Sequence, residues 1–342
     1  MVHTVAGGRR VLEAVEVIES DPRVQITFCR APDAFSSGVD EFLRGTRGVV
    51  LPWEQATRER FDLALAASHG SVHLLHAPLL LVPHGADCGD SGSAGGSSQV
   101  CDPAAPDGEV VAGDLWYDRM VASLPRRPDY RAALGVSPQE RLVVVASTWG
   151  PDSLLARFED LVPRLLDELS GHGVRVASLV HPAAWSAHGV RQVRAWLADC
   201  RDAGLILVEP EVDWRVAVVA ADHVIADHGS VGVYSAALGT PVLLAGPAAD
   251  VRTCAALGDG SARELLRRHA PRLTSDRSVV AQLEDAARGA GALAERVRDS
   301  LAARPGRAAI ELRRAAYRLL HLLEPRRYRP PVPVPVSGSP SA

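Results

Sequence analysis

The sequence contains no lysine, so that arginine supplies all 37 of its basic residues. This absence excludes a Walker-type phosphate loop, which requires a lysine against the phosphates. It also excludes a pyridoxal Schiff base and any mechanism that uses a lysine nucleophile or base. A cationic side chain that contacts a phosphate must therefore be an arginine or a histidine.

Cysteines and long apolar runs are also few, and the net charge is small. The five cysteines show no Cys-x-x-Cys spacing and leave one unpaired, which predicts a reducing compartment and neither a disulfide framework nor a zinc site. We recognise no apolar run of transmembrane length and no signal peptide. The net charge of -4 gives no electrostatic footprint for nucleic acid. We expect a soluble cytoplasmic protein without nucleic-acid partners or an integral membrane segment.

Length and patterning indicate two α/β domains. The 342 residues suffice for two domains of ordinary size. Short apolar segments alternate with segments of helical periodicity, which predicts parallel sheets with helices on both faces. We expect an N-terminal Rossmann-like domain at 1–125, a C-terminal Rossmann-like domain at 137–305, a C-terminal helix at 306–328 and a Pro-rich disordered tail at 329–342.

The N-terminal half has three irregular features. Its first residues are typical of the end of a strand and a glycine turn at Gly7 and Gly8, followed by a helix at 9–20. On this interpretation the chain begins inside its first strand. Residues 86–107, rich in Gly, Ser, Asp and Pro, predict a flexible loop. A hinge is expected between 125 and 137.

Polar residues follow several predicted strands at their carboxyl ends. Ligands of open parallel sheets bind beyond that edge, so these residues are candidates for a site. They are His84 and Gly85 after the strand 79–82, Ser147, Thr148 and Trp149 after 142–146, His181 after 174–180, and Asp227, His228, Gly229 and Ser230 after 224–226.

The last of these strands opens the clearest pattern in the chain. It runs into the turn Asp-His-Gly-Ser, where a helix begins that ends near Gly239, and Pro241 leads into another strand. The backbone N–H groups and the dipole at the start of such a helix suit a phosphate. The alternative is an ordinary βαβ crossover in which Ser230 caps the helix.

Five short motifs occur in the same order as in a known family. This chain has Pro-His-Gly at 83–85, Gly-Asp-Leu-Trp-Tyr-Asp at 113–118, Ser-Thr-Trp at 147–149, His-Pro at 181–182, and Asp-His-Gly-Ser at 227–230 followed by Leu-Gly-Thr-Pro. It thereby resembles the CDP-glycerol glycerophosphotransferase family, the teichoic-acid polymerases and their relatives. That family has Trp-His-Gly, Gly-x-Pro-Arg-x-Asp, Pro-Thr-Trp, His-Pro, and Asp-Tyr-Ser-Ser followed by Leu-Gly-x-Pro.

The resemblance implies the GT-B fold, with two Rossmann-like domains facing a cleft and a nucleotide-activated donor on the C-terminal domain. On this analogy the histidine of the His-Gly turn, His84, would face the acceptor as a candidate base. The phosphates of the donor would contact His181 and Ser230, and the nucleotide side of the site would include Ser147, Thr148, Trp149, Asp227, His228 and Gly229. The acceptor side would include His3, Gly7, Gly8 and Gly85.

The chain also departs from the family. Gly229 replaces a serine, Tyr234 stands where the family usually has an aspartate, and the lysine after the His-Gly turn is absent. These departures argue against polymerisation of glycerol phosphate. They favour a small transferase, or a relative that has kept the fold and lost the activity.

The chemistry of the same residues points to transfer from a nucleotide diphosphate to a hydroxyl. An imidazole titrates near neutrality, so His84 would take the acceptor proton. His181, Ser230 and the N–H groups of the turn would stabilise the leaving pyrophosphate. No Asp-x-Asp motif follows a strand in the expected place, so we expect no obligatory metal and no other cofactor.

Two alternatives stay open. A nucleotide-sugar 2-epimerase would need carboxylates beside the sugar, and Asp227, Glu209 and Glu211 lie near strand ends. A binding or scaffold protein that kept the fold without catalysis is consistent with the degenerate segment 86–107. The nucleotide base, the transferred group, the acceptor and the oligomeric state do not follow from the sequence.

Overall fold

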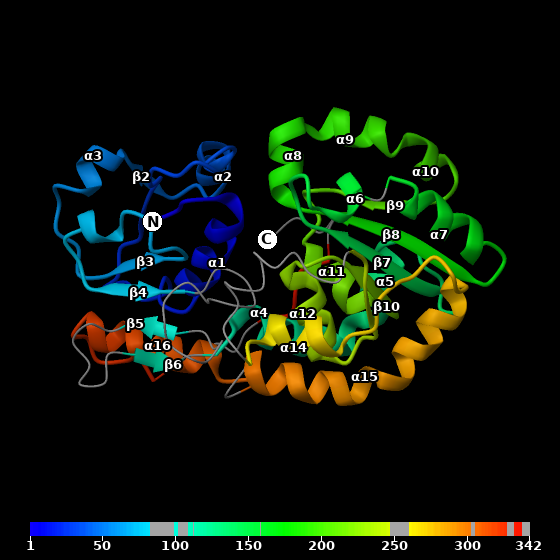
Figure 1. Ribbon diagram of the computed structural model, residues 1–342. Coiled ribbons are helices and arrows are strands. Elements are labelled where there is room, and N and C mark those ends of the chain that lie inside the picture. The colour runs from blue at the N-terminus through cyan, green and yellow to red at the C-terminus, as the bar shows by residue number, and fades with distance from the viewer. Residues whose placement is uncertain are drawn as a thin grey trace. The chain divides into compact units, whose positions relative to one another are not determined.

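The computed structural model describes residues 1–82, 99–101, 109–111, 113–157, 159–246, 260–301, 305–326 and 332–336. It divides into two compact α/β units, and Figure 1 labels most of their elements. The N-terminal unit comprises Met1–Cys88, Ser97–Asp118 and Ala302–Pro331, and the C-terminal unit Gly89–Gly96, Arg119–Leu301 and Val332–Ala342. Both units contain parallel strands joined through helices, and the predicted α/β fold with Rossmann-like units is confirmed.

The C-terminal unit is built on a five-stranded parallel sheet with the order β11-β10-β7-β8-β9. Its strands are β7 (Arg141–Ser147), β8 (Val174–Val180), β9 (Ile206–Val208), β10 (His223–Ala226) and β11 (Val242–Leu244). The middle of β7 is buried, as a strand covered on both faces requires. The chain starts at the centre, builds outward to β9, and then crosses over to β10. The point where the order reverses therefore lies between β7 and β10.

Helices with clear local signals cover this sheet. Asp213 caps α11 by accepting a hydrogen bond from the Arg215 N–H, and Ser261 caps α14 in the same way through Glu264. Gly239, in the left-handed region at φ 90°, ends α12. The helices are η2 (Leu124–Arg126), α5 (Arg127–Ala133), α6 (Leu154–Arg157), α7 (Leu161–Leu169), α8 (Pro182–His188), α9 (Val190–Trp196), α10 (Ala198–Asp202), α11 (Trp214–Ala220), α12 (Ser230–Leu238), α14 (Ala262–His269) and α15 (Val279–Leu301).

The N-terminal unit has two separate parallel pairs of strands and one antiparallel pair. The parallel pairs are β1 (Thr27–Cys29) with β2 (Val49–Leu51), and β3 (Ala64–Ala66) with β4 (Leu79–Leu81); the antiparallel pair is β5 (Gln99–Cys101) with β6 (Glu109–Val111). Val2 forms an isolated parallel bridge with Arg30, which continues β1. Its helices are α1 (Val5–Glu16), α2 (Val39–Gly45), α3 (Trp53–Ala56), η1 (Val72–Leu74), the start of α4 (Leu115–Ser123) and α16 (Ala308–Leu319).

Helix α16 packs into the core of the N-terminal unit although it follows the C-terminal sheet in the sequence. Leu312 and Ala316 are buried together with Val11 and Val15 of α1 and Leu80 of β4. The start of α16 is held by Asp118, whose carboxylate accepts hydrogen bonds from the N–H groups of Gly306 and Ala308. Burial raises the pKa of Asp118, and these two bonds oppose the shift.

The predicted glycine turn at Gly7 and Gly8 is wrong. Both residues lie inside α1, which begins at Val5 after the cap Thr4. A Cβ on Gly8 would lie 2.4 Å from Cε1 of Phe42 and 2.9 Å from Cγ1 of Val2. The glycine therefore permits close packing of α1, a requirement that a sequence does not distinguish from a turn.

Two connecting segments also differ from the prediction. The expected hinge between 125 and 137 contains η2 and α5, and Arg127 and Arg131 of α5 form ion pairs with Asp222. The expected loop at 86–107 includes strand β5, and the remainder of it lies outside the described residues.

The Pro-rich tail is ordered where the structure describes it. Val334 is fully buried in the C-terminal unit. Its N–H donates to the Ser123 hydroxyl at 2.9 Å, and its carbonyl accepts from the Tyr130 hydroxyl at 2.7 Å. The prediction of a disordered tail is wrong for residues 332–336, because an apolar side chain between prolines found a pocket that composition does not reveal.

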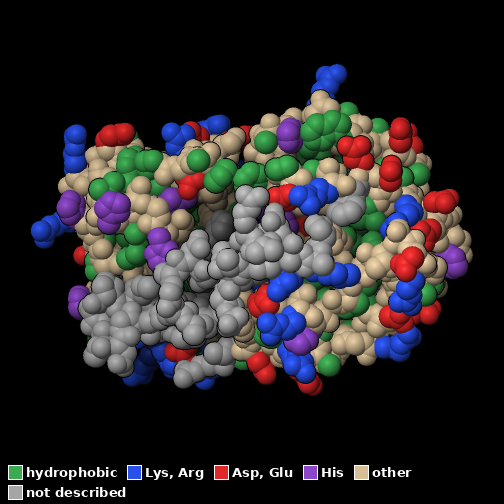
Figure 2. Space-filling view, viewed as in Figure 1, with side chains coloured by type: hydrophobic (Ala, Val, Ile, Leu, Met, Phe, Trp, Pro, Cys, Tyr) green, Lys and Arg blue, Asp and Glu red, His purple; other side chains and the backbone are tan. Residues whose placement is uncertain are grey.

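The surface carries charges of both signs. Figure 2 shows acidic and basic side chains intermingled over the visible face of the C-terminal unit. Among the described helices, none combines the length and the hydropathy that crossing a membrane requires.

Candidate functional site

The predicted donor-site residues meet at one edge of the C-terminal sheet. The structure places Ser147 at the end of β7 with Thr148 and Trp149 directly after it, and His181 directly after β8. Asp227 to Gly229 lie between β10 and α12, and Ser230 is the first residue of α12. β7 pairs with β8 on one side and with β10 on the other, so the three loops are neighbours. The edge includes the reversal point between β7 and β10, where open α/β sheets bind ligands.

Asp227 joins the two central loops. Its carboxylate oxygen Oδ2 accepts hydrogen bonds from the Thr148 N–H at 2.8 Å, the Thr148 hydroxyl at 2.7 Å and the Leu154 N–H at 3.0 Å. Its Oδ1 accepts from the Gly229 N–H at 3.1 Å. The side chain is buried, and its negative charge is directed at these donors. The contacts of Asp227 are those of a residue that fixes the shape of the site.

Gly229 lets the two loops approach each other. A Cβ at this position would lie 2.7 Å from Cγ2 of Thr148. As the residue before α12, Gly229 also offers no side chain to the first N–H groups of the helix, beginning with that of Ser230. These groups and the positive end of the helix dipole can therefore serve an anion. The comparison of motifs identifies Gly229 only as the loss of a serine hydroxyl. The packing against Thr148 shows why a residue without a side chain fits this position.

His181 is held in one tautomer by its own helix. Its Nδ1 accepts a hydrogen bond from the Ala183 N–H at 3.1 Å, which caps α8, and Pro182 follows at the first helical position. A neutral imidazole that accepts at Nδ1 carries its proton on Nε2. Nε2–H is therefore a hydrogen-bond donor, which suits a phosphate oxygen better than it suits a general base.

Trp149 adds an aromatic surface beside His181. The two ring centroids lie 6.5 Å apart with an interplanar angle of 31°. The side chain of Trp149 is 43% exposed, although large aromatic side chains are usually buried. An exposed indole at the carboxyl end of a strand offers a flat apolar face to a planar ligand.

The remaining predicted residues of this edge have local partners. Ser147 is buried, accepts a hydrogen bond from the Leu155 N–H and donates to the Thr148 carbonyl. His228 is exposed, with Nε2 at 3.5 Å from the Thr148 hydroxyl. Sequence reasoning missed the contribution of Leu154, because a backbone donor leaves no trace in residue type.

Cations and carboxylates near this edge are largely paired with each other. Arg194 forms an ion pair with Glu209 at 3.0 Å, and Arg157 pairs with Asp152. Among the described side chains, no group of three or more histidines, cysteines and carboxylates is placed to hold a metal ion.

The predicted acceptor-side residues lie in the N-terminal unit. His3 is buried, and its Nε2 lies 2.5 Å from the Gly70 carbonyl oxygen. Burial lowers the pKa of His3, and the contact with Gly70 opposes this shift. Gly7 and Gly8 are in α1, as described above. The candidate base His84 and its neighbour Gly85 lie outside the described residues.

The structure has a GT-B-like fold, the fold of solved structures to which it is similar. The structure is similar to that of the wall teichoic acid polymerase TagF, with a TM-score of 0.57 and 12% identity over 92% of this chain and 84% of that one. It is also similar to a putative UDP-N-acetylglucosamine 2-epimerase from Listeria monocytogenes, with a TM-score of 0.53 and 14% identity over 96% and 97% of the chains.

These similarities are structural and show the fold. No protein-family model matches the sequence, and no curated protein matches it either. The resemblance found in the short motifs and the similarity to TagF agree, although the sequence identity is low.

Proposed function

We propose that this protein is a transferase that moves a glycosyl or glycerophosphate-type group from a nucleotide diphosphate donor to a hydroxyl acceptor. The observation that carries the proposal is the set of hydrogen-bond donors at the carboxyl ends of β8, β7 and β10. The N–H groups at the start of α12 and the Nε2–H of His181 both belong to it. Such donors would stabilise the negative charge that develops on a leaving diphosphate.

The parts of the donor would divide between these residues. The diphosphate would lie against Ser230 and His181, and the planar base would lie against the exposed ring of Trp149. Asp227 would hold Thr148 and Gly229 in place and would not itself touch the phosphates, because its oxygens already accept four hydrogen bonds. We propose that His84 takes the acceptor proton, that no metal ion is required, and that the protein works in the cytoplasm.

A thermal-shift titration tests donor binding directly. CDP, UDP, GDP and TDP are each added to the wild type and to His181→Ala, Ser230→Ala and Trp149→Ala. A ligand that binds only the folded state raises the melting temperature, by an amount that follows its concentration relative to Kd. The proposal expects one diphosphate to stabilise the wild type, with affinity reduced about tenfold or more in each variant.

His172→Ala is the matched control for His181→Ala. His172 is exposed and precedes β8, so it lies at the opposite end of the same strand. This variant should bind the diphosphate as the wild type does. Equal binding by the wild type and all three site variants would place the nucleotide elsewhere and contradict the proposal.

A nucleotide-sugar 2-epimerase is the second candidate, and the similarity to the Listeria protein favours it. Of the carboxylates proposed for it, Asp227 accepts four hydrogen bonds and Glu209 is paired with Arg194. Incubation with a labelled nucleotide sugar, without any acceptor, distinguishes the two activities. A change in the configuration of the recovered sugar supports the epimerase, and release of nucleotide only when an acceptor is added supports the transferase.

A further inference from the structure

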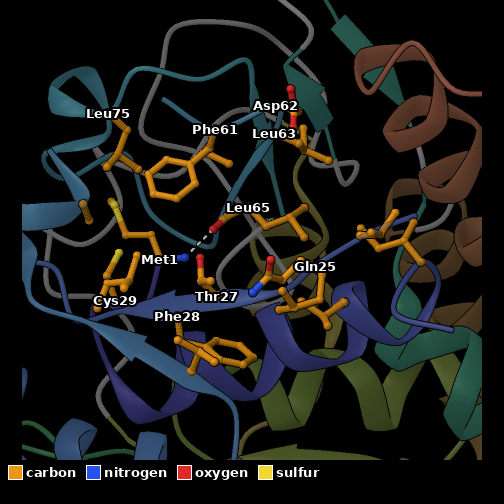
Figure 3. A pocket seen from close by; sticks show the side chains of 18 of the residues that line it. Met1, Gln25, Thr27, Phe28, Cys29, Phe61, Asp62, Leu63, Leu65 and Leu75 are labelled. Carbon is orange, nitrogen blue, oxygen red and sulfur yellow. Dashed lines mark hydrogen bonds between the residues drawn. The ribbon is translucent and has the colours of Figure 1, made fainter. Parts of the chain in front are cut away.

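The chain that follows α16 still belongs to the N-terminal unit. A cavity of about 750 Å³ separates β1 from β3 in this unit, and Figure 3 shows Thr27 of β1 and Leu65 of β3 among the residues that line it. Leu320 and Leu322, which come directly after α16, line the same cavity. These two leucines therefore place the segment after α16 in the core of the N-terminal unit.

Two arginines hold the chain a few residues further on. The Arg23 guanidinium donates to the Leu323 carbonyl at 2.9 Å, and the Arg313 guanidinium donates to the Pro325 carbonyl at 3.2 Å. The chain is thus fixed to the N-terminal unit as far as Pro325. Residues 332–336 are instead bound to the C-terminal unit. The Pro-rich tail therefore meets the C-terminal unit as a peptide meets its receptor.

The place where the tail is bound matches the backbone of one residue, Val334. It consists of Ser123 at the end of α4 and Tyr130 of α5, both fully buried, and we call it the tail site. The Val334 N–H donates to the Ser123 hydroxyl at 2.9 Å, and the Tyr130 hydroxyl donates to the Val334 carbonyl at 2.7 Å. Ser123 gives its own proton to the Arg119 carbonyl at 2.7 Å, so it serves the tail as an acceptor. The tail site therefore binds one N–H and one C=O of the same residue.

The triplet Pro-Val-Pro at 333–335 presents these groups in a restricted conformation. Proline has no N–H, so Val334 carries the sole backbone donor of the triplet. Proline also confines itself and the residue before it to extended conformations, so the triplet loses little conformational entropy on binding. The Val334 side chain is fully buried, whereas Val332 is 66% exposed. The tail site thus recognises one peptide unit and one apolar side chain between prolines.

The surface beside the tail site offers further contacts to a longer segment. Val121 and Leu124, on either side of Ser123 in the chain, are both exposed although they are apolar. The partly exposed Arg126 lies with its guanidinium carbon 5.8 Å from the ring centroid of Tyr130. Apolar side chains with arginine near an aromatic ring are typical of surfaces that bind other proteins.

We propose that the tail site binds a proline-rich segment of another protein, an extended chain that contains Pro-Val-Pro, and that the chain's own tail occupies the site until such a segment displaces it. Among the described residues, the tail is held by two hydrogen bonds and one buried side chain, a small set of contacts that a competitor can replace. A segment that continues over Val121 and Leu124 would gain contacts that the resident tail lacks.

A second copy of this chain does not fit the role of the partner. Each copy brings one tail site and one tail. An exchange of tails between two copies leaves the hydrogen bonds of Val334 unchanged, while association costs translational and rotational freedom. A different protein with the same triplet has no site of its own to fill, so it gains the contacts outright.

Displacement of the tail is measured on the full-length wild type. The probe is the free peptide Pro-Pro-Val-Pro-Val-Pro-Val, the sequence of residues 330–336. Hydrogen exchange of the Val334 amide reports the docked tail directly, because this N–H is bound by Ser123. The proposal expects peptide at millimolar concentration to speed this exchange about tenfold or more. A control peptide with aspartate in place of each valine should leave the exchange unchanged.

Binding to an open tail site is measured on Val334→Asp, in which the tail detaches. The labelled peptide should bind this variant about tenfold or more tightly than it binds Val332→Asp, the control whose tail stays docked and competes from the same chain. Addition of Tyr130→Phe to Val334→Asp removes one hydrogen bond and should weaken peptide binding about fivefold. Fluorescence anisotropy of the peptide gives these affinities.

Three results would overturn the proposal. The first is an unchanged Val334 amide in the wild type, which decides alone if Val334→Asp does not fold. The second is equal peptide binding by Val334→Asp with and without Tyr130→Phe. The third is protection of the Val334 amide that rises with the concentration of the wild type, together with dimers in sedimentation, because it would assign the tail site to a second copy.

Discussion

Each unit has a buried polar side chain that connects the two loops at the middle of its sheet edge. The two side chains differ in the number of hydrogen bonds they make there. In the C-terminal unit Asp227, after β10, accepts four hydrogen bonds, two of them from Thr148 after β7. In the N-terminal unit His3 follows the short strand at Val2 and contacts the carbonyl of Gly70 after β3. The same topological position is held by a carboxylate in one unit and by an imidazole in the other.

The difference concerns how a buried charge is satisfied. The Asp227 carboxylate collects backbone and hydroxyl donors, so a negative charge is tolerated in a buried place. His3 has a carbonyl partner, and its pKa is lowered because burial disfavours the charged ring. A polar residue at a strand end can thus hold the loops of a site together without contacting a ligand. The connections made by Asp227 and by His3 should therefore respond differently to mutation and to pH.

The largest expected effect comes from removing the Asp227 carboxylate and its four hydrogen bonds. Asp227→Ala leaves the N–H groups of Thr148, Leu154 and Gly229 without their acceptor, and we expect a loss of about 3 kcal/mol or more from the free energy of unfolding. Urea denaturation of the C-terminal unit measures this loss. Asp199→Ala, at an exposed position in α10, is the control and should stay within about 0.5 kcal/mol of the wild type. A loss below about 1 kcal/mol for Asp227→Ala would contradict the assigned role.

The docked tail offers the next test within the C-terminal unit. Val334→Asp would place a charge in an apolar pocket, so the segment should detach instead, at a cost of about 2 kcal/mol for the lost burial. Val332→Asp is the matched control, because Val332 is 66% exposed and should tolerate the charge. Urea denaturation compares the two, and equal stabilities would show that the tail does not dock.

Glycine-to-alanine substitutions at two close contacts, one in each unit, compare the cost of crowding in the two units. Gly229→Ala places a Cβ against Thr148 without any gain in helix propensity, and we expect a cost of about 2 kcal/mol. Gly8→Ala meets Phe42 and Val2, but alanine gains about 1 kcal/mol inside a helix, so its net cost should be about 1 kcal/mol. Gly45→Ala, with nothing within 4 Å, is the control. A greater loss for Gly8→Ala than for Gly229→Ala would reverse this order.

The smallest expected effect is a dependence of stability on pH. Because the folded pKa of His3 lies below its unfolded value, the unfolded chain binds the proton more readily. The contribution of His3 to stability is complete above about pH 6.5 and falls as the pH drops below that value, by at most about 1.4 kcal/mol per pH unit.

His3→Gln keeps an amide donor near Gly70 and does not titrate. It should flatten the profile of the N-terminal unit between about pH 7 and pH 5, while His223, whose pKa burial also lowers, keeps its contribution in the C-terminal unit. Melting temperatures of both proteins across this range give the measurement. Identical slopes for the wild type and His3→Gln would show that His3 does not contribute to the dependence of stability on pH.

The position of Thr148, His181 and Asp227 at one edge of the C-terminal sheet could be predicted from the sequence because it depends on local order. Strands rich in Val, Leu, Ile and Ala followed by Thr148, His181 or Asp227 place these residues at one sheet edge as soon as the strands are parallel. What each residue does there was not readable. The capping bond of His181 and the contact between Gly229 and Thr148 arise between segments far apart in the chain or from backbone atoms, which residue types do not specify.

Residue order and type were enough to predict the alternation of strands and helices, the chemistry excluded by the lack of lysine, and the polar residues at the strand ends. These follow from periodicity and residue type, which act over a few neighbouring residues. The tertiary structure alone decided that Gly7 and Gly8 lie in a helix, that Val334 is buried, that α16 completes the N-terminal core and that a gap separates β1 from β3. Each of these depends on contacts between distant segments, because packing selects among conformations that local sequence leaves nearly equal in free energy.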